Sequence, residues 1–175
     1  MNQKINIPYE ISSMPEYVVD QLTAGILPTF FPVSFVFDQS HCTGVYDTGS
    51  FRNLLSISRI SIKDLLWIVC RLLEMIAENE KHYFFGEIYR IDRKTVYVNH
   101  TFSQVKLIFE PMETLCPIKV QLHNLLQECK AMVSEDGIGY LEDMAAWLAR
   151  EDIGYISAIH HGEQLQNEIY ACDIQ

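Results

Sequence analysis

The chain has 175 residues, of which 49% are apolar and 21% are charged, which is the composition of a folded domain rather than a disordered segment. Its 13 basic and 23 acidic side chains give a formal net charge of −10. Because an acidic surface repels phosphates, this charge excludes nucleic acids and anionic lipid surfaces as expected partners.

The sequence shows no sign of export or of direct membrane insertion. Its first six residues lack the basic segment and apolar core of a signal peptide, and the longest apolar run, residues 65–70, is too short to span a membrane. Five cysteines at irregular spacing fit reduced thiols better than a disulfide framework. We therefore expect a cytoplasmic protein that forms a single domain over residues 1–175.

The first half of the chain predicts a β-hairpin. Residues 33–37, Val-Ser-Phe-Val-Phe, alternate as a half-buried strand does. The polar residues 38–43 predict a turn, and a second strand begins at residues 44–46.

The clearest pattern is that of a long central helix over residues 62–79. Ser61 is placed to cap it, and Asp64 stands three residues later, as in a capping box. The apolar residues follow at steps of three and four, which predicts one buried stripe along the helix. They are Ile62, Leu65, Leu66, Val69, Leu72, Leu73 and Ile76.

A second hairpin and a helical third complete the prediction. Residues 95–99 and 105–109 alternate as two strands. From residue 118 onward the pattern predicts three helices, of which the second ends at Gly154. The order of strands, long helix, hairpin and helices is typical of an α+β domain.

This order, read with two short motifs, resembles a truncated and degenerate protein-kinase-like fold. Residues 44–55, Gly-Val-Tyr-Asp-Thr-Gly-Ser-Phe-Arg-Asn-Leu-Leu, are similar to the hinge between the two kinase lobes. Residues 105–108, Val-Lys-Leu-Ile, are similar to the strand that leads into the metal-binding Asp-Phe-Gly. The resemblance covers about residues 22–111 and leaves residues 112–175 as an acidic helical part.

The catalytic parts of a kinase are missing from the matching positions. Phe109-Glu110-Pro111 stands where Asp-Phe-Gly is expected, and residues 83–92 contain no His-Arg-Asp. The sequence has no Gly-x-Gly-x-x-Gly, and the strand 33–37 has no lysine. Since phosphoryl transfer depends on metal ions and on positioning, the resemblance implies a domain that is not an enzyme.

Two bacterial groups share parts of this pattern. Leu27-Pro28 beside the first strand and Tyr46-Asp47 before a Gly-Ser turn resemble an uncharacterised domain found N-terminal to forkhead-associated modules. The chain is also similar to the degenerate kinase-like cytoplasmic domain of a type VII secretion component. These resemblances imply a protein-interaction or scaffolding role in bacterial signalling or secretion.

A remnant of the kinase cleft would lie near four residues, Asp47, Gly49, Glu87 and Asp92. They are candidates for binding a small ligand, but ordinary turn and surface roles explain the same residue types, and we favour that interpretation.

Other candidates are weaker. His160 and His161, with Glu163, lack the spacing of a metal shell, so we expect surface histidines, no metal site and no cofactor. His41 beside Cys42, or Glu87 with Asp92, would have to carry an alternative function as a small thiol or carboxylate enzyme. We expect the aromatic residues 83–85 to be buried beneath the long helix rather than exposed to a partner.

The acidity is concentrated at one end of the chain. Residues 134–175 contain Arg150 as their one basic residue and nine acidic residues, a net charge of −8. We expect a face formed by Glu142, Asp143, Glu151 and Asp152 to dock a protein partner with a basic surface, the alternative being a solvated face. A structural subunit that oligomerises through its helical third is a further alternative.

Overall fold

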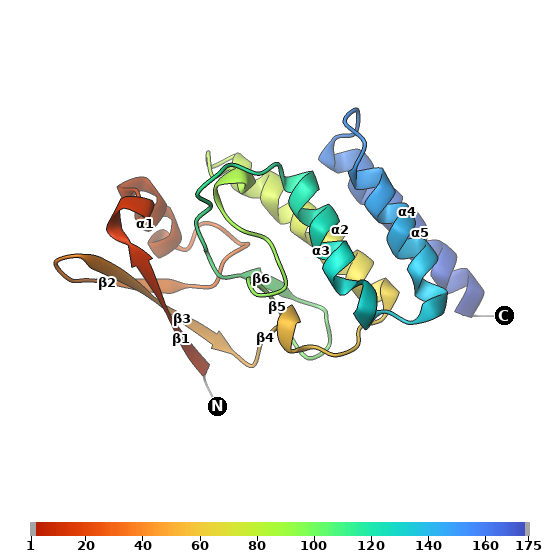
Figure 1. Cartoon of the computed structure of the whole chain (residues 1–175), viewed down its shortest axis with the longest axis horizontal. Coiled ribbons are helices and arrows are strands. Elements are labelled where there is room, and N and C mark those ends of the chain that lie inside the picture. Colours follow the sequence, from red (N-terminus) through yellow and green to blue (C-terminus); the bar gives the residue numbers. More distant parts are fainter. Residues whose placement is uncertain (1–2, 174–175) are drawn as a thin grey trace.

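The computed structural model describes residues 3–173 and, in this range, has six strands in two small sheets and five α-helices (Figure 1). The strands are β1 (Gln3–Glu10), β2 (Val33–Phe37), β3 (His41–Gly49), β4 (Arg52–Asn53), β5 (Val96–Val98) and β6 (Val105–Leu107). The helices are α1 (Glu16–Ala24), α2 (Ile62–Glu80), α3 (Ile118–Cys129), α4 (Ile138–Leu148) and α5 (Tyr155–Asp173). This architecture confirms the α+β class.

The first sheet is antiparallel, with β3 between β1 and β2. It confirms the predicted hairpin, in which Val33 lies opposite Tyr46. The turn is shorter than predicted, because β3 already begins at His41. Neither β1 nor α1 is among the elements predicted from the sequence.

Helix α2 forms as predicted. Ser61 caps it, since its Oγ accepts a hydrogen bond from the backbone nitrogen of Asp64 at 3.0 Å. The hydroxyl also donates to the Asp64 carboxylate at 2.6 Å, which completes the local cap. Buried side chains occur along the whole helix, so that it is covered on more than one side.

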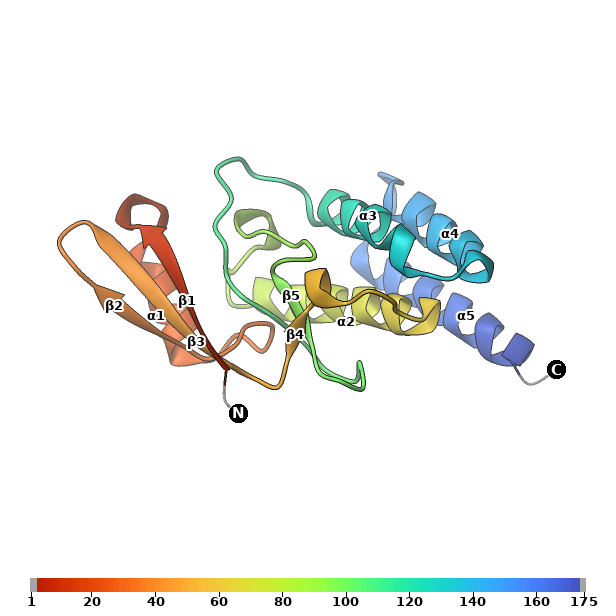
Figure 2. The same cartoon turned by 60° about the horizontal axis from the view of Figure 1, so that its bottom comes forward.

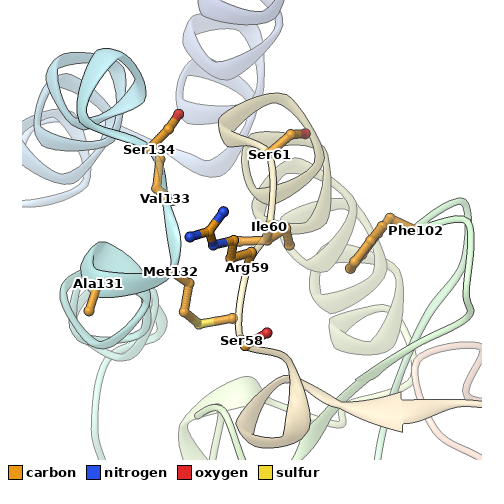
Figure 3. A pocket seen from close by; sticks show the side chains of 9 residues that line it. All are labelled: Ser58, Arg59, Ile60, Ser61, Phe102, Ala131, Met132, Val133 and Ser134. Atoms are coloured by element: carbon orange, nitrogen blue, oxygen red, sulfur yellow. The ribbon is translucent and has the colours of Figure 1, made fainter.

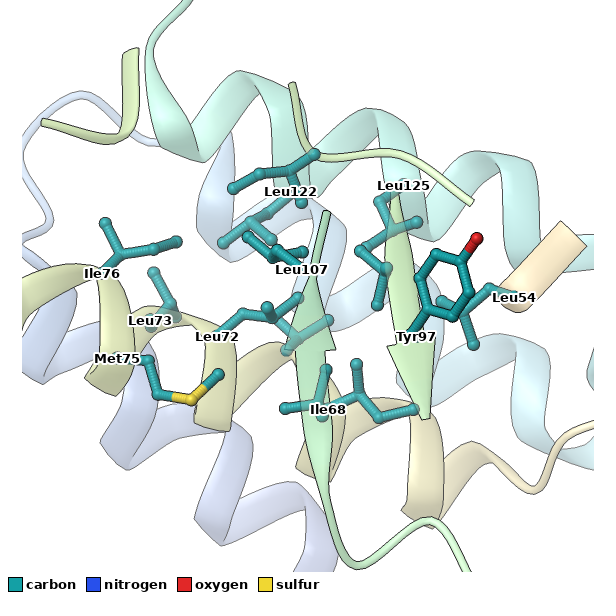
Figure 4. Close-up of a cluster of buried hydrophobic side chains, with 14 of the residues drawn as sticks. Leu54, Ile68, Leu72, Leu73, Met75, Ile76, Tyr97, Leu107, Leu122 and Leu125 are labelled. Carbon is teal, nitrogen blue, oxygen red and sulfur yellow. The ribbon is translucent and has the colours of Figure 1, made fainter. Parts of the chain in front are cut away.

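The second sheet, in the order β4–β5–β6, packs on α2. The predicted second hairpin is confirmed, although its strands are shorter, at Val96–Val98 and Val105–Leu107. Figure 4 shows Ile68 and Leu72 of α2 meeting Leu107 of β6, with Leu122 of α3 reaching the same cluster. The core is therefore built from segments far apart in the sequence.

The predicted helical third is confirmed as α3, α4 and α5, but one boundary is wrong. Helix α4 ends at Leu148, with Ala149 still in right-handed conformation, and Gly154 directly precedes α5 instead of ending α4. Helix α5 packs mainly against α2.

Two views show the first sheet and α1 at one end of the molecule, the helices α3 to α5 at the other, and the second sheet between them (Figures 1 and 2). Across residues 3–173, none of the helices combines the length and apolar character needed to cross a membrane.

Candidate functional site

A cleft of about 500 Å³ lies where the two sheets meet. Residues from β1, from the segment around β5 and from the segment after β6 line it. They include Tyr9, Glu10, Asn53, Lys94, Thr95, Tyr97, Ile108, Glu110 and Pro111. A concave site of about this volume, lined by apolar and a few polar side chains, is the kind of place where a small ligand can bind.

Beside this cleft, two buried tyrosines form a chain of hydrogen bonds. The Tyr9 hydroxyl lies 2.7 Å from the Tyr46 hydroxyl and donates to the backbone oxygen of Phe109 at 2.6 Å. Burial raises the pKa of both tyrosines, so both hydroxyls stay protonated at neutral pH. The pair joins the first sheet to the segment after β6 and supplies no base.

Glu110 lies in the segment where the sequence comparison expects Asp-Phe-Gly, and its carboxylate is paired within the chain. Glu110 Oε1 lies 3.0 Å from Arg90 Nε, and the backbone nitrogen of Arg90 donates to the Glu110 carbonyl at 2.8 Å. Glu110 stands between Phe109 and Pro111, and Arg90 balances the charge of its carboxylate. Its role in the fold is to fasten two adjacent segments.

The four predicted cleft residues are not brought together. The Asp47 carboxylate accepts a hydrogen bond from the Gly49 nitrogen at 3.2 Å, in a turn where Gly49 has a φ of 55°. Asp92 accepts from the nitrogens of Lys94 and Thr95 at 2.8 and 3.0 Å. Glu87 lies in a short 3-10 turn, Gly86–Ile88. Within residues 3–173, none of the four lines the cleft described above.

The thiol at Cys42 has no base beside it. Cys42 is fully buried, and burial raises the pKa of its thiol. His41 instead places Nδ1 2.7 Å from the Ser40 hydroxyl, in the exposed turn of the hairpin. A protonated, buried thiol is a poor nucleophile, so this arrangement gives no support to thiol catalysis.

A second cavity, of about 540 Å³, lies between the segment before α2 and the segment before α4 (Figure 3). Its charged group is Arg59, whose guanidinium extends between the two segments. The hydroxyls of Ser58, Ser61 and Ser134 stand around it, but Ser61 is committed to the Asp64 carboxylate. The cavity contains no pairing of nucleophile and base.

The predicted acidic residues lie on α4 and in the loop after it, and three of the four are paired within the chain. Glu142 lies 2.6 Å from Lys130 Nζ, and Asp143 lies 3.1 Å from His161 Nε2. Asp152 lies 2.9 Å from the Arg150 guanidinium, and both Asp152 and Glu151 are exposed. The pairs with Lys130 and Arg150 are exposed, and exposed pairs contribute little stability.

The expectation that residues 83–85 are all buried is wrong. Phe84 is fully buried, whereas the side chains of Tyr83 and Phe85 are 79% and 48% exposed. The sequence shows three successive aromatic residues, and this pattern does not indicate which of them faces the core.

The fold defined by these elements is an α+β arrangement with a small N-terminal sheet and a larger helical part. No known protein family and no curated protein matches the chain. Among solved structures it is similar to the EssB cytoplasmic fragment of Geobacillus thermodenitrificans, with a TM-score of 0.54 and 12% identity, covering 96% of this chain and 86% of that one. An EssB cytoplasmic fragment of Staphylococcus aureus gives a TM-score of 0.42 and 11% identity, covering 89% and 81%. At such identities, the first similarity concerns the fold alone.

Proposed function

We propose that this chain is a non-catalytic protein-interaction or scaffolding domain with a degenerate protein-kinase-like fold, which acts in the cytoplasm of a bacterium in secretion or signalling. The observation that carries the proposal is the state of the cleft between the sheets. Glu110 is paired with Arg90, and the Tyr9 hydroxyl donates to the Phe109 carbonyl, so these groups are occupied by contacts within the chain.

The chemistry of phosphoryl transfer supports this proposal. That reaction needs metal-binding carboxylates, a lysine on the phosphates and a residue that positions the attacking hydroxyl. Strand β2 contains no lysine, and residues 83–92 contain no His-Arg-Asp. The remaining titratable groups beside the cleft are neutral tyrosines, Lys94 and two glutamates, one of them paired.

The similarity to an EssB cytoplasmic fragment supports the secretion side of the proposal, since the sequence independently resembles the cytoplasmic domain of a type VII secretion component. The expected partner is a protein with a basic surface, because the formal charge of the chain is −10. Nucleic acid and direct membrane insertion have no part in the proposal.

The proposal is tested by combining a biochemical and a cellular measurement. The purified chain is melted with and without Mg-ATP and incubated with radiolabelled ATP. We expect a melting shift below about 1 °C and no transferred phosphate, and phosphate transfer to the chain or to a protein substrate would overturn the proposal.

The cellular arm uses a strain lacking the gene, complemented with variants. Glu110→Ala and Arg90→Ala remove the paired groups of the cleft, and each is expected to restore secretion or signalling to the level of the parent chain. Because the pair is partly exposed, its loss changes stability by less than about 1 kcal/mol. A complete loss of function in both folded variants would point to cleft chemistry and contradict the proposal.

A further inference from the structure

The loop after α2 presents two exposed aromatic side chains on a buried anchor. The anchor is Phe84, which is fully buried, with its ring 5.5 Å from that of Phe30 and 5.6 Å from that of Tyr89 between centroids. Tyr83 and Phe85 stand on either side of it in the chain and are largely exposed. The two exposed side chains therefore belong to the same short loop, two residues apart in the chain.

Tyr83 occupies a backbone position that favours glycine. Its nitrogen donates to the Glu80 carbonyl at 3.0 Å, and the Phe84 nitrogen donates to the Asn79 carbonyl at 3.1 Å. These two bonds form the Schellman motif, in which the penultimate residue is left-handed, and Tyr83 has a φ of 59°. A side chain with a β-carbon is strained there, and glycine is not.

No internal contact of the Tyr83 side chain accounts for that strain. The side chain is 79% exposed, and within residues 3–173 its hydroxyl has no described hydrogen bond and its ring no described aromatic contact. Strain that is retained at an exposed residue, without a compensating contact, indicates a functional constraint on that residue.

The loop is held rigidly on both sides. Gly86 packs so closely that a β-carbon would lie 2.1 Å from Ile118 Cδ1. The side-chain amide of Gln121 donates to the Gly86 carbonyl at 3.3 Å, and that of Gln21 donates to the His82 carbonyl at 3.0 Å. A surface fixed in this way loses little conformational freedom when it binds a partner.

Two carboxylates accompany the aromatic pair. The Tyr155 hydroxyl donates to Glu80 Oε1 at 3.1 Å. Burial raises the pKa of Tyr155, and the negative charges of Glu80 and Glu87 add to this rise. None of the ion pairs found in residues 3–173 involves either carboxylate, and the adjacent Lys81 is paired with Glu78. The charge of Glu80 and Glu87 is therefore available to a partner.

We propose that Glu80, Tyr83, Phe85 and Glu87, the aromatic-acidic patch, bind a basic segment of a protein partner through an arginine. This inference rests on the interaction function proposed above and assigns it a surface. The guanidinium group fits both features of the patch, since it stacks on aromatic rings and pairs with carboxylates. Lysine, a compact and strongly hydrated charge, gains less from an aromatic face. The acidic residues of α4 and the loop after it are less available, because Glu142 and Asp152 are paired with Lys130 and Arg150 and Asp143 contacts His161.

The first test is the Tyr83→Gly variant of the full chain. Because glycine relieves the left-handed strain, we expect the melting temperature to rise by about 2 °C. The same variant is expected to lose partner binding. A fall in melting temperature would mean that Tyr83 has a stabilising role, and would overturn the strain argument and the proposal with it.

The second test uses a defined probe, a short peptide with two arginines flanking a leucine, titrated into the isotope-labelled chain. We expect shifts in the amide resonances of Tyr83, Phe85 and Glu87. Affinity is expected to fall at least fivefold for Tyr83→Gly and for the double variant Glu80→Gln/Glu87→Gln. A lysine version of the peptide is expected to bind more weakly, and a glutamate version not at all.

The matched control is the double variant Glu142→Gln/Glu151→Gln, which makes the same change in charge on α4 and the loop after it and is expected to keep full affinity. Peptide shifts confined to residues 142–152 would overturn this inference but leave the interaction function intact. Absence of binding at millimolar peptide would also overturn it. Phosphate transfer from ATP, by contrast, would overturn the proposed function and is measured independently of the peptide.

Discussion

The hydroxyl of Tyr9 donates a hydrogen bond to the backbone oxygen of Phe109 at 2.6 Å, across a separation of 100 residues. The same hydroxyl lies 2.7 Å from that of Tyr46, so Tyr46 acts as the donor of the second bond. All three residues are buried. This short chain of hydrogen bonds therefore fastens the first sheet to the segment after β6, where the candidate cleft lies.

Replacing Tyr9 with phenylalanine tests how much this connection contributes. The change removes the hydrogen bond to the buried Phe109 carbonyl and the contact between the Tyr9 and Tyr46 hydroxyls, and we expect the free energy of unfolding to fall by about 1–3 kcal/mol. Urea denaturation measures the loss. Tyr17→Phe, at an exposed position of α1, is the control and is expected to change stability by less than about 0.5 kcal/mol. Equal stabilities for the two variants would contradict the proposed connection.

Replacing each of two glycines by alanine is expected to change the stability of the chain in opposite directions. A β-carbon at Gly86 would lie 2.1 Å from Ile118 Cδ1, so Gly86→Ala should destabilise the chain by about 1–3 kcal/mol through overpacking. At Gly139 in α4 no atom lies within 4 Å of the added carbon, and Gly139→Ala should stabilise the helix by about 0.5–1 kcal/mol. Thermal melts of the two variants give the signs. A rise for Gly86→Ala would show that the packing around Gly86 is looser than described, and a fall for Gly139→Ala would contradict the expected gain in helix stability.

The parts of the fold that could be predicted carry their signals locally. Helix α2 has its cap at Ser61 and its apolar stripe within one segment, and the two hairpins have their partners close in sequence. Strand β1 was not predictable in this way, because Tyr9 pairs opposite Cys42 on a distant segment. The end of α4 was misplaced for a similar reason. Lys119 of α3 donates to the carbonyls of Arg150 and Ile153 at 2.6 and 2.8 Å, so a tertiary contact satisfies groups that a glycine cap was expected to serve.

The candidate site was less predictable than the fold. The interpretation of Asp47, Gly49 and Asp92 as turn residues agrees with their hydrogen bonds to neighbouring backbone nitrogens. The cleft itself depends on Tyr9 and Glu10, which belong to the strand that the sequence did not reveal. Tyr83 is exposed and has a left-handed backbone, and local sequence patterns at a non-glycine residue indicate neither property.

Because some thiols are buried, the free energy of unfolding is expected to depend on pH. Burial raises the pKa of Cys70 and of Cys129 to about 12 each, whereas in the unfolded chain such thiols ionise near pH ~8.5–9. Their contribution to stability is complete below the unfolded pKa, and it is lost as the pH rises from there toward 12. Between pH 8 and pH 10 we expect a loss of about 1 kcal/mol for each thiol, measured by urea denaturation.

The double variant Cys70→Ala/Cys129→Ala is expected to show a flatter dependence over the same pH range, whatever its stability at pH 8. Cys172→Ala, at an exposed position, is the control and should keep the slope of the parent chain. A slope unchanged in the double variant would mean that other groups cause the loss.

The last prediction concerns the acidic residues of α4 and the following loop, and it depends on their charge rather than on a specific contact. If Glu142, Asp143, Glu151 and Asp152 dock a basic surface, the affinity of a partner should fall as salt rises, because exposed charges are screened at short range. On that premise, neutralising all four by Gln or Asn weakens binding by about tenfold or more and reduces the salt dependence, whereas binding through the aromatic-acidic patch leaves the affinity of this variant unchanged. Since three of them are held in exposed pairs, the folded chain should lose less than about 1 kcal/mol per pair.

The comparison that decides this prediction is a second variant with the same change in net charge elsewhere. Glu10, Glu16, Asp20 and Glu113 are exposed carboxylates outside α4, and their neutralisation alters the overall charge by the same four units. If net charge alone attracts the partner, both variants lose the same affinity, and the α4 face has no special role. If the face is a docking surface, the α4 variant alone loses binding, while both retain the melting behaviour of a folded chain. Surface plasmon resonance at two salt concentrations distinguishes the two results, since a docking face changes the dissociation rate and long-range attraction changes chiefly the association rate.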